Sequence, residues 1–187
     1  MPQSADRRPT TRIGYGFDSH EFHAGIPLKI GGIKLDHDKG LGGHSDGDVL
    51  LHAITDALLG AIAAPDIGAL FPPSDPKWKG ADSAVFLREA LKRVRDGGYA
   101  VANVDASLIL ASPKIGPHST AIRARVAELM GVTTDCVGLK AKTPEGLNLE
   151  NAAIAHAVVL LERSAISKPA RKKGKVRKKT SRKVTNK

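Results

Sequence analysis

The sequence predicts a single α/β domain, an α+β two-layer sandwich in which helices pack on one face of a mixed sheet of about four to five strands. Two observations support this prediction. Strand-like and helix-like hydrophobic patterns alternate in part along the chain. In addition, 187 residues with 41% hydrophobic content suit one domain with a sizeable core.

Two strands and a helix are predicted in the first third of the chain. Residues 12–18 and 27–35 have strand character, and the second segment alternates apolar with polar positions. A loop rich in Gly, His and Asp covers residues 36–47. The stretch 48–64 has apolar residues at helical spacing, which predicts the first helix.

The middle of the chain predicts a long loop, a helix and a strand. Three prolines within five residues exclude regular helix from the loop at residues 65–80. Residues 81–97 predict a helix with Asp82 or Ser83 as its N-cap. Residues 99–110 alternate as expected for a long strand.

The last third predicts a helix at residues 117–130, a strand at 137–142 and a further element at 152–161. Periodicity does not separate helix from strand for that last element, but its valine and leucine run favours a strand. There is no internal repeat. The segment 14–16 is too short for a dinucleotide-binding loop, because it lacks the third glycine and the following helix.

A candidate metal site combines a strand with the first helix. Residues i and i+2 of a strand point to the same side, so Asp18 and His20 could hold one ion. A third ligand is expected from the helix at residues 48–64. The metal-competent residues on one polar stripe of that helix are Asp48, His52 and Asp56. Three protein ligands with one open position are typical of catalytic zinc.

A simpler interpretation of these residues stays open at this point. An Asp-x-His pair occurs by chance in many strands, and a polar helix face is more often only solvated. Cys136 is the only cysteine, which excludes an intrachain disulfide and a cysteine-rich zinc site. Any metal site must therefore use histidine and carboxylate ligands.

The net charge of +10 is concentrated at one end of the chain. Residues 168–187 hold eleven Lys or Arg and no acidic residue, so residues 1–167 carry 10 minus 11, or about −1. Residues 164–187 are predicted to be a disordered basic tail, and residues 1–11 a flexible extension. Binding of nucleic acid or another polyanion and a merely solubilising role are both open for the tail.

No membrane segment is predicted. The chain has no apolar run of about 18 residues, and residues 1–11 are polar, unlike a signal peptide. We therefore expect a cytoplasmic protein.

Several ordered motifs carry a resemblance to a known enzyme family. The matching segments are residues 12–20, 43–48, 52, 55–60, 66–68, 71–72, 79–83, 103–105 and 140–143. From about Arg12 to Arg163, the chain resembles the 2-C-methyl-D-erythritol 2,4-cyclodiphosphate synthase family. The predicted domain therefore covers residues 12–163.

The resemblance implies a reaction in non-mevalonate isoprenoid precursor biosynthesis. In this family, the 2-phosphate of 4-diphosphocytidyl-2-C-methyl-D-erythritol 2-phosphate attacks the β-phosphorus, CMP leaves, and a cyclic diphosphate forms. Asp18, His20 and His52 match the ligands of Zn2+ or another divalent transition metal. Glu145 matches the carboxylate that reaches Mg2+ or Mn2+ on the substrate diphosphate. The family is a homotrimer with active sites between subunits.

Further residues acquire roles through the same resemblance. His44 and Thr143 match the catalytic groups that stabilise the transition state, and Ser45 helps to hold the substrate. Asp56 either contacts the polyol or orients His52. The residues expected to bind the erythritol phosphate are Asp66, Ile67, Gly68, Phe71, Ser74 and Asp75. The residues expected at the cytidine, supplied by a neighbouring subunit, are Leu110, Ala111, Ser112, Pro113, Lys114, Ile115 and Gly116. Lys142 is a further residue expected to bind the substrate.

One segment departs from the family pattern. Residues 146–153 form a shorter stretch without the usual arginine, which in the family faces a cavity on the threefold axis. The departure puts an isoprenoid diphosphate ligand of that cavity in doubt for this chain.

Two other functions compete with the synthase. A metal-dependent phosphoesterase would use water as nucleophile and would need a further carboxylate or histidine for a second metal. A polyanion-binding module without activity is supported only by the basic tail.

Overall fold

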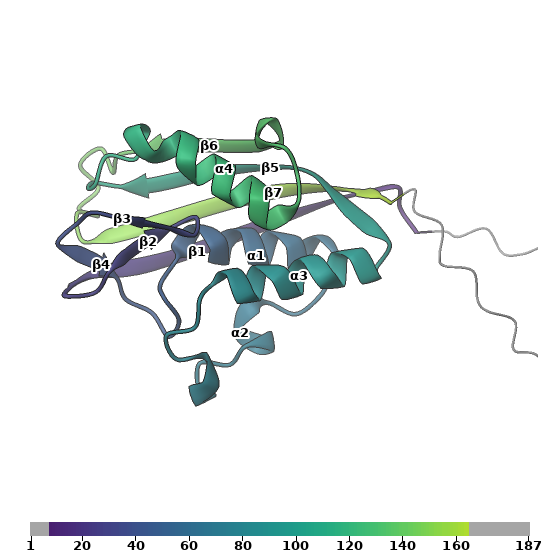
Figure 1. The fold of residues 1–187 in the computed structure, drawn as a ribbon, viewed down its shortest axis with the longest axis horizontal. Helices are drawn as coiled ribbons and strands as arrows, with labels where there is room; N and C mark the ends of the chain where they lie inside the picture. The colour runs from purple at the N-terminus through teal and green to yellow at the C-terminus, as the bar shows by residue number, and fades with distance from the viewer. Residues whose placement is uncertain (1–7, 165–187) are drawn as a thin grey trace, which may run out of the picture.

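The computed structural model describes residues 8–164, and Figure 1 shows their fold. Five strands form one sheet in the order β4-β1-β7-β5-β6. The pairs are antiparallel except for β5 and β6, which are parallel. The sheet is thus mixed, as predicted. Residues 1–7 of the predicted extension and nearly all of the predicted basic tail lie outside the described residues.

The main sheet has two long strands from the ends of the domain beside a long strand from its middle. Its strands are β1 (Thr11–Ala24), β4 (Lys39–Leu41), β5 (Tyr99–Leu110), β6 (Val137–Lys142) and β7 (Ala152–Arg163). A separate hairpin consists of β2 (Leu28–Ile30) and β3 (Ile33–Leu35). The element at residues 152–161 is therefore a strand, as its valine and leucine run indicated.

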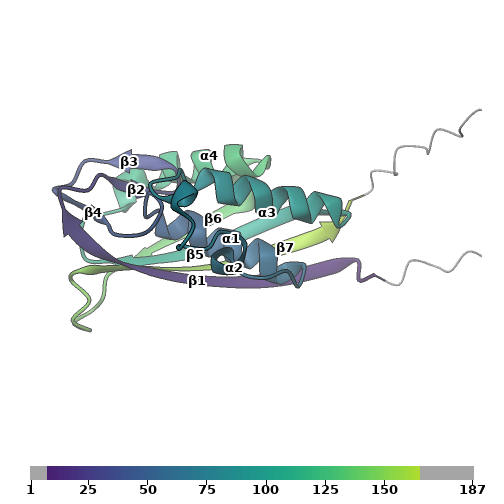
Figure 2. The same cartoon turned by 90° about the horizontal axis from the view of Figure 1, so that it is seen from below.

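The helices pack against one face of the sheet, as Figures 1 and 2 show. They are α1 (Val49–Ala61), α2 (Ile67–Leu70), α3 (Ala84–Asp96) and α4 (Ser119–Met130). Short 3₁₀ turns occur at Pro76–Trp78, Gly116–His118 and Thr134–Cys136. In the described part of the chain, no helix is both long enough and apolar enough to cross a membrane.

Four of the predicted elements differ from the structure, and one of them is the loop at 36–47, which contains the short strand β4. The predicted strand at 27–35 is a hairpin, because Gly31 and Gly32 adopt left-handed backbone conformations (φ 62° and 77°) that reverse the chain. The strand β1 continues past residue 18 to Ala24. The loop at 65–80 contains α2, a short helix that ends before the prolines.

Helix α1 lies unusually close to strand β1. A Cβ atom built on Gly14 would stand 1.8 Å from the carbonyl oxygen of Ala57, and one on Gly16 would stand 2.0 Å from that of Ala53. Only glycine permits this approach, since no real Cβ contact is so short. The close packing brings the helix residue His52 over the strand residues Asp18 and His20.

The other face of the sheet is apolar and exposed. Ile13, Tyr15 and Phe17 of β1 are 69%, 58% and 47% exposed, and Val158 of the neighbouring β7 is 43% exposed. No described helix covers this face (Figure 2). A contiguous apolar surface of this kind is typical of a protein–protein interface.

Candidate functional site

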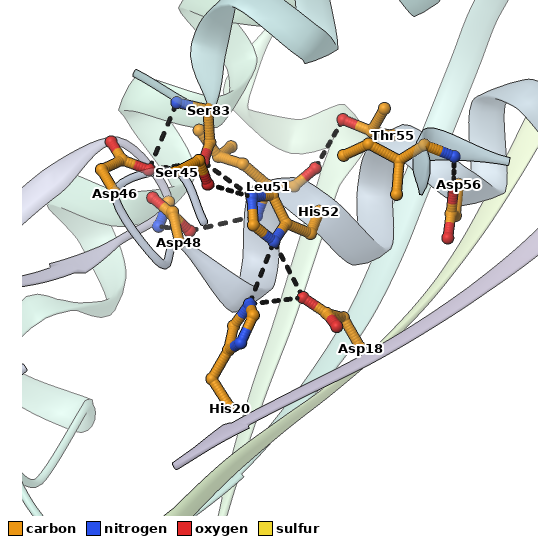
Figure 3. A network of polar contacts seen from close by, with 12 residues as sticks. Asp18, His20, Ser45, Asp46, Asp48, Leu51, His52, Thr55, Asp56 and Ser83 are labelled. Carbon is orange, nitrogen blue, oxygen red and sulfur yellow. Dashed lines mark hydrogen bonds and ion pairs between the residues drawn. The ribbon is translucent and has the colours of Figure 1, made fainter. Parts of the chain in front are cut away.

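The structure brings the predicted metal ligands together. Oδ2 of Asp18 lies 2.9 Å from Nε2 of His20 and 2.9 Å from Nδ1 of His52. The two histidine nitrogens are 3.1 Å apart. The three ligand atoms form a nearly equilateral triangle, visible in Figure 3 where the side chains converge from β1 and α1.

This triangle fits a divalent metal ion. One carboxylate and two imidazoles are ligands that zinc and its neighbours accept. In a tetrahedral site with bonds of about 2.0–2.1 Å, ligand atoms stand roughly 3.3 Å apart, so a few tenths of an ångström of opening suffices. Among residues 8–164, this is the one group of three or more His, Cys, Asp or Glu that could hold an ion.

The electrostatics favour an ionised Asp18. Burial alone would raise the pKa of its carboxyl, but hydrogen bonds and charge interactions with His20 and His52 outweigh burial and lower the pKa to about 2. Asp18 is therefore an anionic donor at neutral pH, as a metal ligand must be.

The far side of the His52 ring is held by two serines. Nε2 of His52 lies 2.8 Å from Oγ of Ser83 and 3.0 Å from Oγ of Ser45. The hydroxyl of Ser83 also donates to the carboxylate of Asp46, and Asp46 pairs with Lys29 at 2.9 Å. Burial acts to raise the pKa of Asp46, but the hydrogen bonds from Ser83 and Lys29 keep it below its ordinary value.

The other acidic residues of the predicted polar stripe have different partners. Asp48 is fully buried and is the N-cap of α1, where its carboxylate accepts from the backbone N–H of Leu51, as well as from those of Gly31 and Gly32. Burial raises the pKa of Asp48 and also that of Asp56. Asp56 accepts from the backbone N–H of Ile67 at 2.8 Å, so it positions the start of α2.

The metal cluster opens into a cavity of about 200 Å³. Its lining residues are Asp18, His20, His44, Ser45, His52, Ile67, Gly68, Phe71, Pro73, Trp78 and Phe86. His44 is also held by the loop at its rim, because its Nε2 lies 3.3 Å from the backbone oxygen of Asp75. This cavity therefore unites the metal ligands with one predicted catalytic residue and part of the predicted substrate loop.

Three other predicted residues of the substrate loop are not among the residues that line the metal cavity. Asp66 is the N-cap of α2 and accepts from the backbone N–H of Ala69 at 2.7 Å. Asp75 caps the next 3₁₀ turn and pairs with Lys77 at 2.7 Å. Neither Asp66 nor Asp75 lines the cavity, and neither does the exposed Ser74.

Sequence reasoning did not predict the aromatic wall of the cavity. The rings of Phe71, Trp78 and Phe86 pack together with centroid separations of 4.6 to 5.6 Å. Trp78 and Phe86 had no motif to mark them, because apolar residues are common in any helix or loop. The serine Ser83 was predicted only as a possible N-cap.

A second cavity, of about 410 Å³, collects the remaining predicted residues. It is lined by Leu110, Pro113, Lys114, Ile115, Gly116, Pro117, Ala141, Lys142, Thr143 and Glu145. Ala111 and Ser112 are not among its lining residues; Ser112 instead contacts His37, with 3.2 Å between Oγ and Nε2. No residue lines both this cavity and the metal cavity.

The loop after β6 holds two chemically important residues in the open. Thr143 and Glu145 are exposed, and the hydroxyl of Thr143 donates to the carboxylate of Glu145. Glu145 also has a left-handed backbone conformation (φ 50°), which is uncommon for a residue other than glycine. Such conformations cluster at functional sites.

Comparison with known proteins decides the family. A model of the YgbB family matches residues 11–162, which is most of the described chain. The chain belongs to the YgbB family. A relative from Koribacter versatilis (strain Ellin345), named 2-C-methyl-D-erythritol 2,4-cyclodiphosphate synthase, is 66% identical over 152 residues, covering 81% of this chain and 98% of the relative. A chloroplastic synthase of the same name from Oryza sativa subsp. japonica is 54% identical and is covered to 70%.

Solved structures of the family share the fold. A 2C-methyl-D-erythritol-2,4-cyclodiphosphate synthase described as the CDP-bound form is 46% identical, with a TM-score of 0.77 over 81% of this chain and all of that chain. An IspF–CDP complex from Plasmodium falciparum is 31% identical, with a TM-score of 0.74, and covers 84% of this chain and 99% of that one. The family resemblance and the α+β fold predicted from the sequence are thus confirmed.

Proposed function

We propose that this YgbB-family chain is a phosphorus–oxygen lyase that converts 4-diphosphocytidyl-2-C-methyl-D-erythritol 2-phosphate to 2-C-methyl-D-erythritol 2,4-cyclodiphosphate and CMP. The observation that carries the proposal is the metal-competent triangle of Asp18, His20 and His52, which shares one cavity with His44 and Ser45. A relative that bears the synthase name is 66% identical to this chain. The reaction belongs to isoprenoid precursor biosynthesis.

The chemistry requires positioning more than covalent help. An oxygen of the 2-phosphate forms a bond to the β-phosphorus, and the bond from that phosphorus to the oxygen bridging to the α-phosphate breaks. CMP departs with the bridging oxygen and its electron pair. Because the attack is intramolecular, holding the two phosphates together supplies much of the rate.

Residues of the metal cavity contact the phosphates in this proposal. His44 and Ser45 line the cavity, where their polar hydrogens would bind phosphate oxygens as charge develops. Asp18, His20 and His52 would hold Zn2+ or another divalent transition metal, which polarises a phosphate oxygen and fixes its place when bound. The loop of Asp66, Ile67, Gly68, Phe71, Ser74 and Asp75, together with Asp56, would enclose the erythritol phosphate.

In this proposal, the second cavity binds the nucleotide part of the substrate. Leu110, Ala111, Ser112, Pro113, Lys114, Ile115, Gly116 and Lys142 would bind the cytidine and its phosphates, and Thr143 would stabilise the transferring phosphoryl group. The carboxylate of Glu145 would reach Mg2+ or Mn2+ bridging the diphosphate, since magnesium commonly takes one or two carboxylates and fills its other positions with phosphate oxygens. That two relatives are described as CDP-bound supports a nucleotide subsite.

A homotrimer with active sites between subunits would join the two cavities. No lining residue belongs to both cavities, so one chain presents two half-sites. The apolar face of Ile13, Tyr15 and Val158 offers a surface on which copies can pack. A neighbour's second cavity would then face the metal cavity.

The proposal has three further parts, which concern the location of the protein, its basic tail and a ligand on the threefold axis. A cytoplasmic location is proposed for this chain, whose relatives also include chloroplastic synthases. The basic tail is proposed to attract polyanions or nucleic acid through charge alone. The arginine-free stretch after Glu145 argues against an isoprenoid diphosphate on a threefold axis.

A phosphorus NMR assay tests the reaction. The full-length chain, Zn2+, Mg2+ and the cytidyl substrate should yield CMP and a cyclic diphosphate in equal amounts. Release of inorganic phosphate would instead indicate the competing phosphoesterase. Absence of any turnover in a metal-loaded oligomer would contradict the proposed synthase.

A further inference from the structure

Ser83 stands at the N-cap of α3 without capping it. Its side chain is fully buried, yet its hydroxyl makes no hydrogen bond to the first turn of the helix. The adjacent Asp82 does so instead, accepting from the backbone N–H of Ala84 at 2.9 Å. Serine is favoured at this position for its capping bond, so a buried serine that does not cap has another partner.

The partners of the Ser83 hydroxyl lie in the metal site and behind it. Oγ is 2.8 Å from Nε2 of His52, and it donates to Oδ1 of Asp46. The backbone N–H of Ser83 donates to the same oxygen at 3.2 Å. Lys29 binds the other oxygen of Asp46 at 2.9 Å. A continuous chain of contacts thus runs from Lys29 to His52, and Figure 3 shows its part from Asp46 to the imidazole.

The direction of each hydrogen bond follows from its chemistry. The ammonium of Lys29 favours an ionised Asp46, and an ionised carboxylate only accepts. The proton of Ser83 is therefore committed to Asp46, which leaves a lone pair on Oγ facing His52. That lone pair requires a proton on Nε2 of His52. In a neutral imidazole the other nitrogen, Nδ1, then carries the lone pair.

Nδ1 is the nitrogen that faces the proposed ion. It lies 2.9 Å from Oδ2 of Asp18 and 3.1 Å from Nε2 of His20. Neutral histidine can bind a metal only through its unprotonated nitrogen. The wrong tautomer would place a proton where the metal belongs and would set the lone pair of Nε2 against the lone pair of Ser83 Oγ.

We infer that Ser83, with its proton held by Asp46, is a positioning residue that fixes His52 in the tautomer protonated on Nε2 and so presents Nδ1 to the metal. The inference rests on the metal site of the proposed function. Ligating histidines generally have such a partner for their second nitrogen. Here the partner is a serine backed by a carboxylate, from a helix 31 residues further along the chain than His52.

Ser45 is the competitor for this role. Its Oγ lies 3.0 Å from the same nitrogen and 3.3 Å from Oγ of Ser83. Within residues 8–164, however, no carboxylate binds the Ser45 hydroxyl, so its proton is not committed away from His52. Of the two serines, only Ser83 has its proton held elsewhere, so that its oxygen is fixed as the acceptor for Nε2 of His52.

Histidine ¹⁵N NMR on the metal-free full-length chain tests the inference directly. In the wild type, Nε2 of His52 should be protonated in the metal-free chain, where Nδ1 can donate to Asp18, and Nδ1 should bind the ion once Zn2+ is added. In Ser83→Ala, the two tautomers should mix, and affinity for Zn2+, measured by competition with a chromophoric chelator, should fall by about 10- to 100-fold. Asp46→Asn should change the tautomer of His52 and the affinity for Zn2+ in the same direction, but by less. It replaces Ser83→Ala as the test if that variant does not fold.

Asp82→Ala is the matched control, because it removes a cap from the same helix without touching His52. It should lower the stability of α3 while tautomer and zinc affinity stay as in the wild type. Wild-type tautomer and affinity in both Ser83→Ala and Asp46→Asn would overturn the inference. So would loss of the tautomer in Ser45→Ala alone. A wild-type chain that binds no Zn2+ would contradict the metal site of the proposed function, and the metal-free tautomer would still decide the role of Ser83.

Discussion

The two cavities of this chain are built in opposite ways. The metal cavity lies where α1 packs against β1, and the side chains of Asp18 and His52 are 26% and 11% exposed. The second cavity ends in a loop where Thr143 and Glu145 stand exposed. The first site is held by hydrogen bonds from several elements, whereas the second has few internal partners. In the proposed trimer, the metal cavity would be preorganised within the subunit and the second cavity would be completed by a neighbour.

Of the changes predicted here, removal of a ligand from the metal cavity should have the largest effect on zinc binding and turnover. His52→Ala is expected to abolish zinc binding and to lower turnover by more than about 100-fold, because loss of a ligand's hydrogen-bond partner alone already costs about 10- to 100-fold. Metal analysis of the purified chain and the phosphorus NMR assay measure these effects. His118→Ala, a histidine on the 3₁₀ turn before α4, serves as control. Full zinc content in His52→Ala would contradict the ligand assignment.

Removal of a donor from the exposed half should act on turnover alone. Thr143→Ala is expected to lower kcat by about 10²- to 10³-fold, the usual cost of one transition-state donor. Zinc affinity should not change, since Thr143 lines the other cavity. Steady-state kinetics and a zinc titration on the same sample measure both values. A parallel loss of zinc would show that the two half-sites are not separate in the way that the structure indicates.

Disruption of the exposed apolar face of the sheet should separate the subunits of the proposed trimer, and with them the two half-sites. Val158→Asp places a charge on the exposed apolar face and is expected to convert the proposed trimer to monomers, with loss of most turnover but retention of zinc. Light scattering coupled to size-exclusion chromatography measures the mass. Val85→Asp is a closely matched control, because Val85 on α3 is 42% exposed and Val158 is 43% exposed. An active monomer of Val158→Asp would contradict the shared active site.

The contrast between local patterns and tertiary contacts explains which features of the fold and the site the sequence could predict. Asp18 and His20 followed from the two-residue repeat of a strand. Local periodicity placed the third ligand on a polar helix stripe, and the family resemblance then selected His52. Ser83 was missed because its role depends on a tertiary contact that no local pattern encodes. The hairpin at residues 28–35 was missed although the Gly31–Gly32 pair is a turn signal, since the alternating apolar residues on both sides resembled one strand.

The smallest predicted effect concerns the support behind the metal site. The folded-state pKa of Asp46 is below its unfolded value, so the ionised group stabilises the fold at pH values above the unfolded pKa. This stabilisation is lost as the pH falls through the folded pKa, where Ser83 and Lys29 lose their anionic acceptor. Urea unfolding should therefore show a stability difference between wild type and Asp46→Asn at pH 6 that narrows towards pH 3. A constant difference across this range would mean that packing, and not the charge of Asp46, holds Ser83 against His52. The buried half-site would then be preorganised by shape alone.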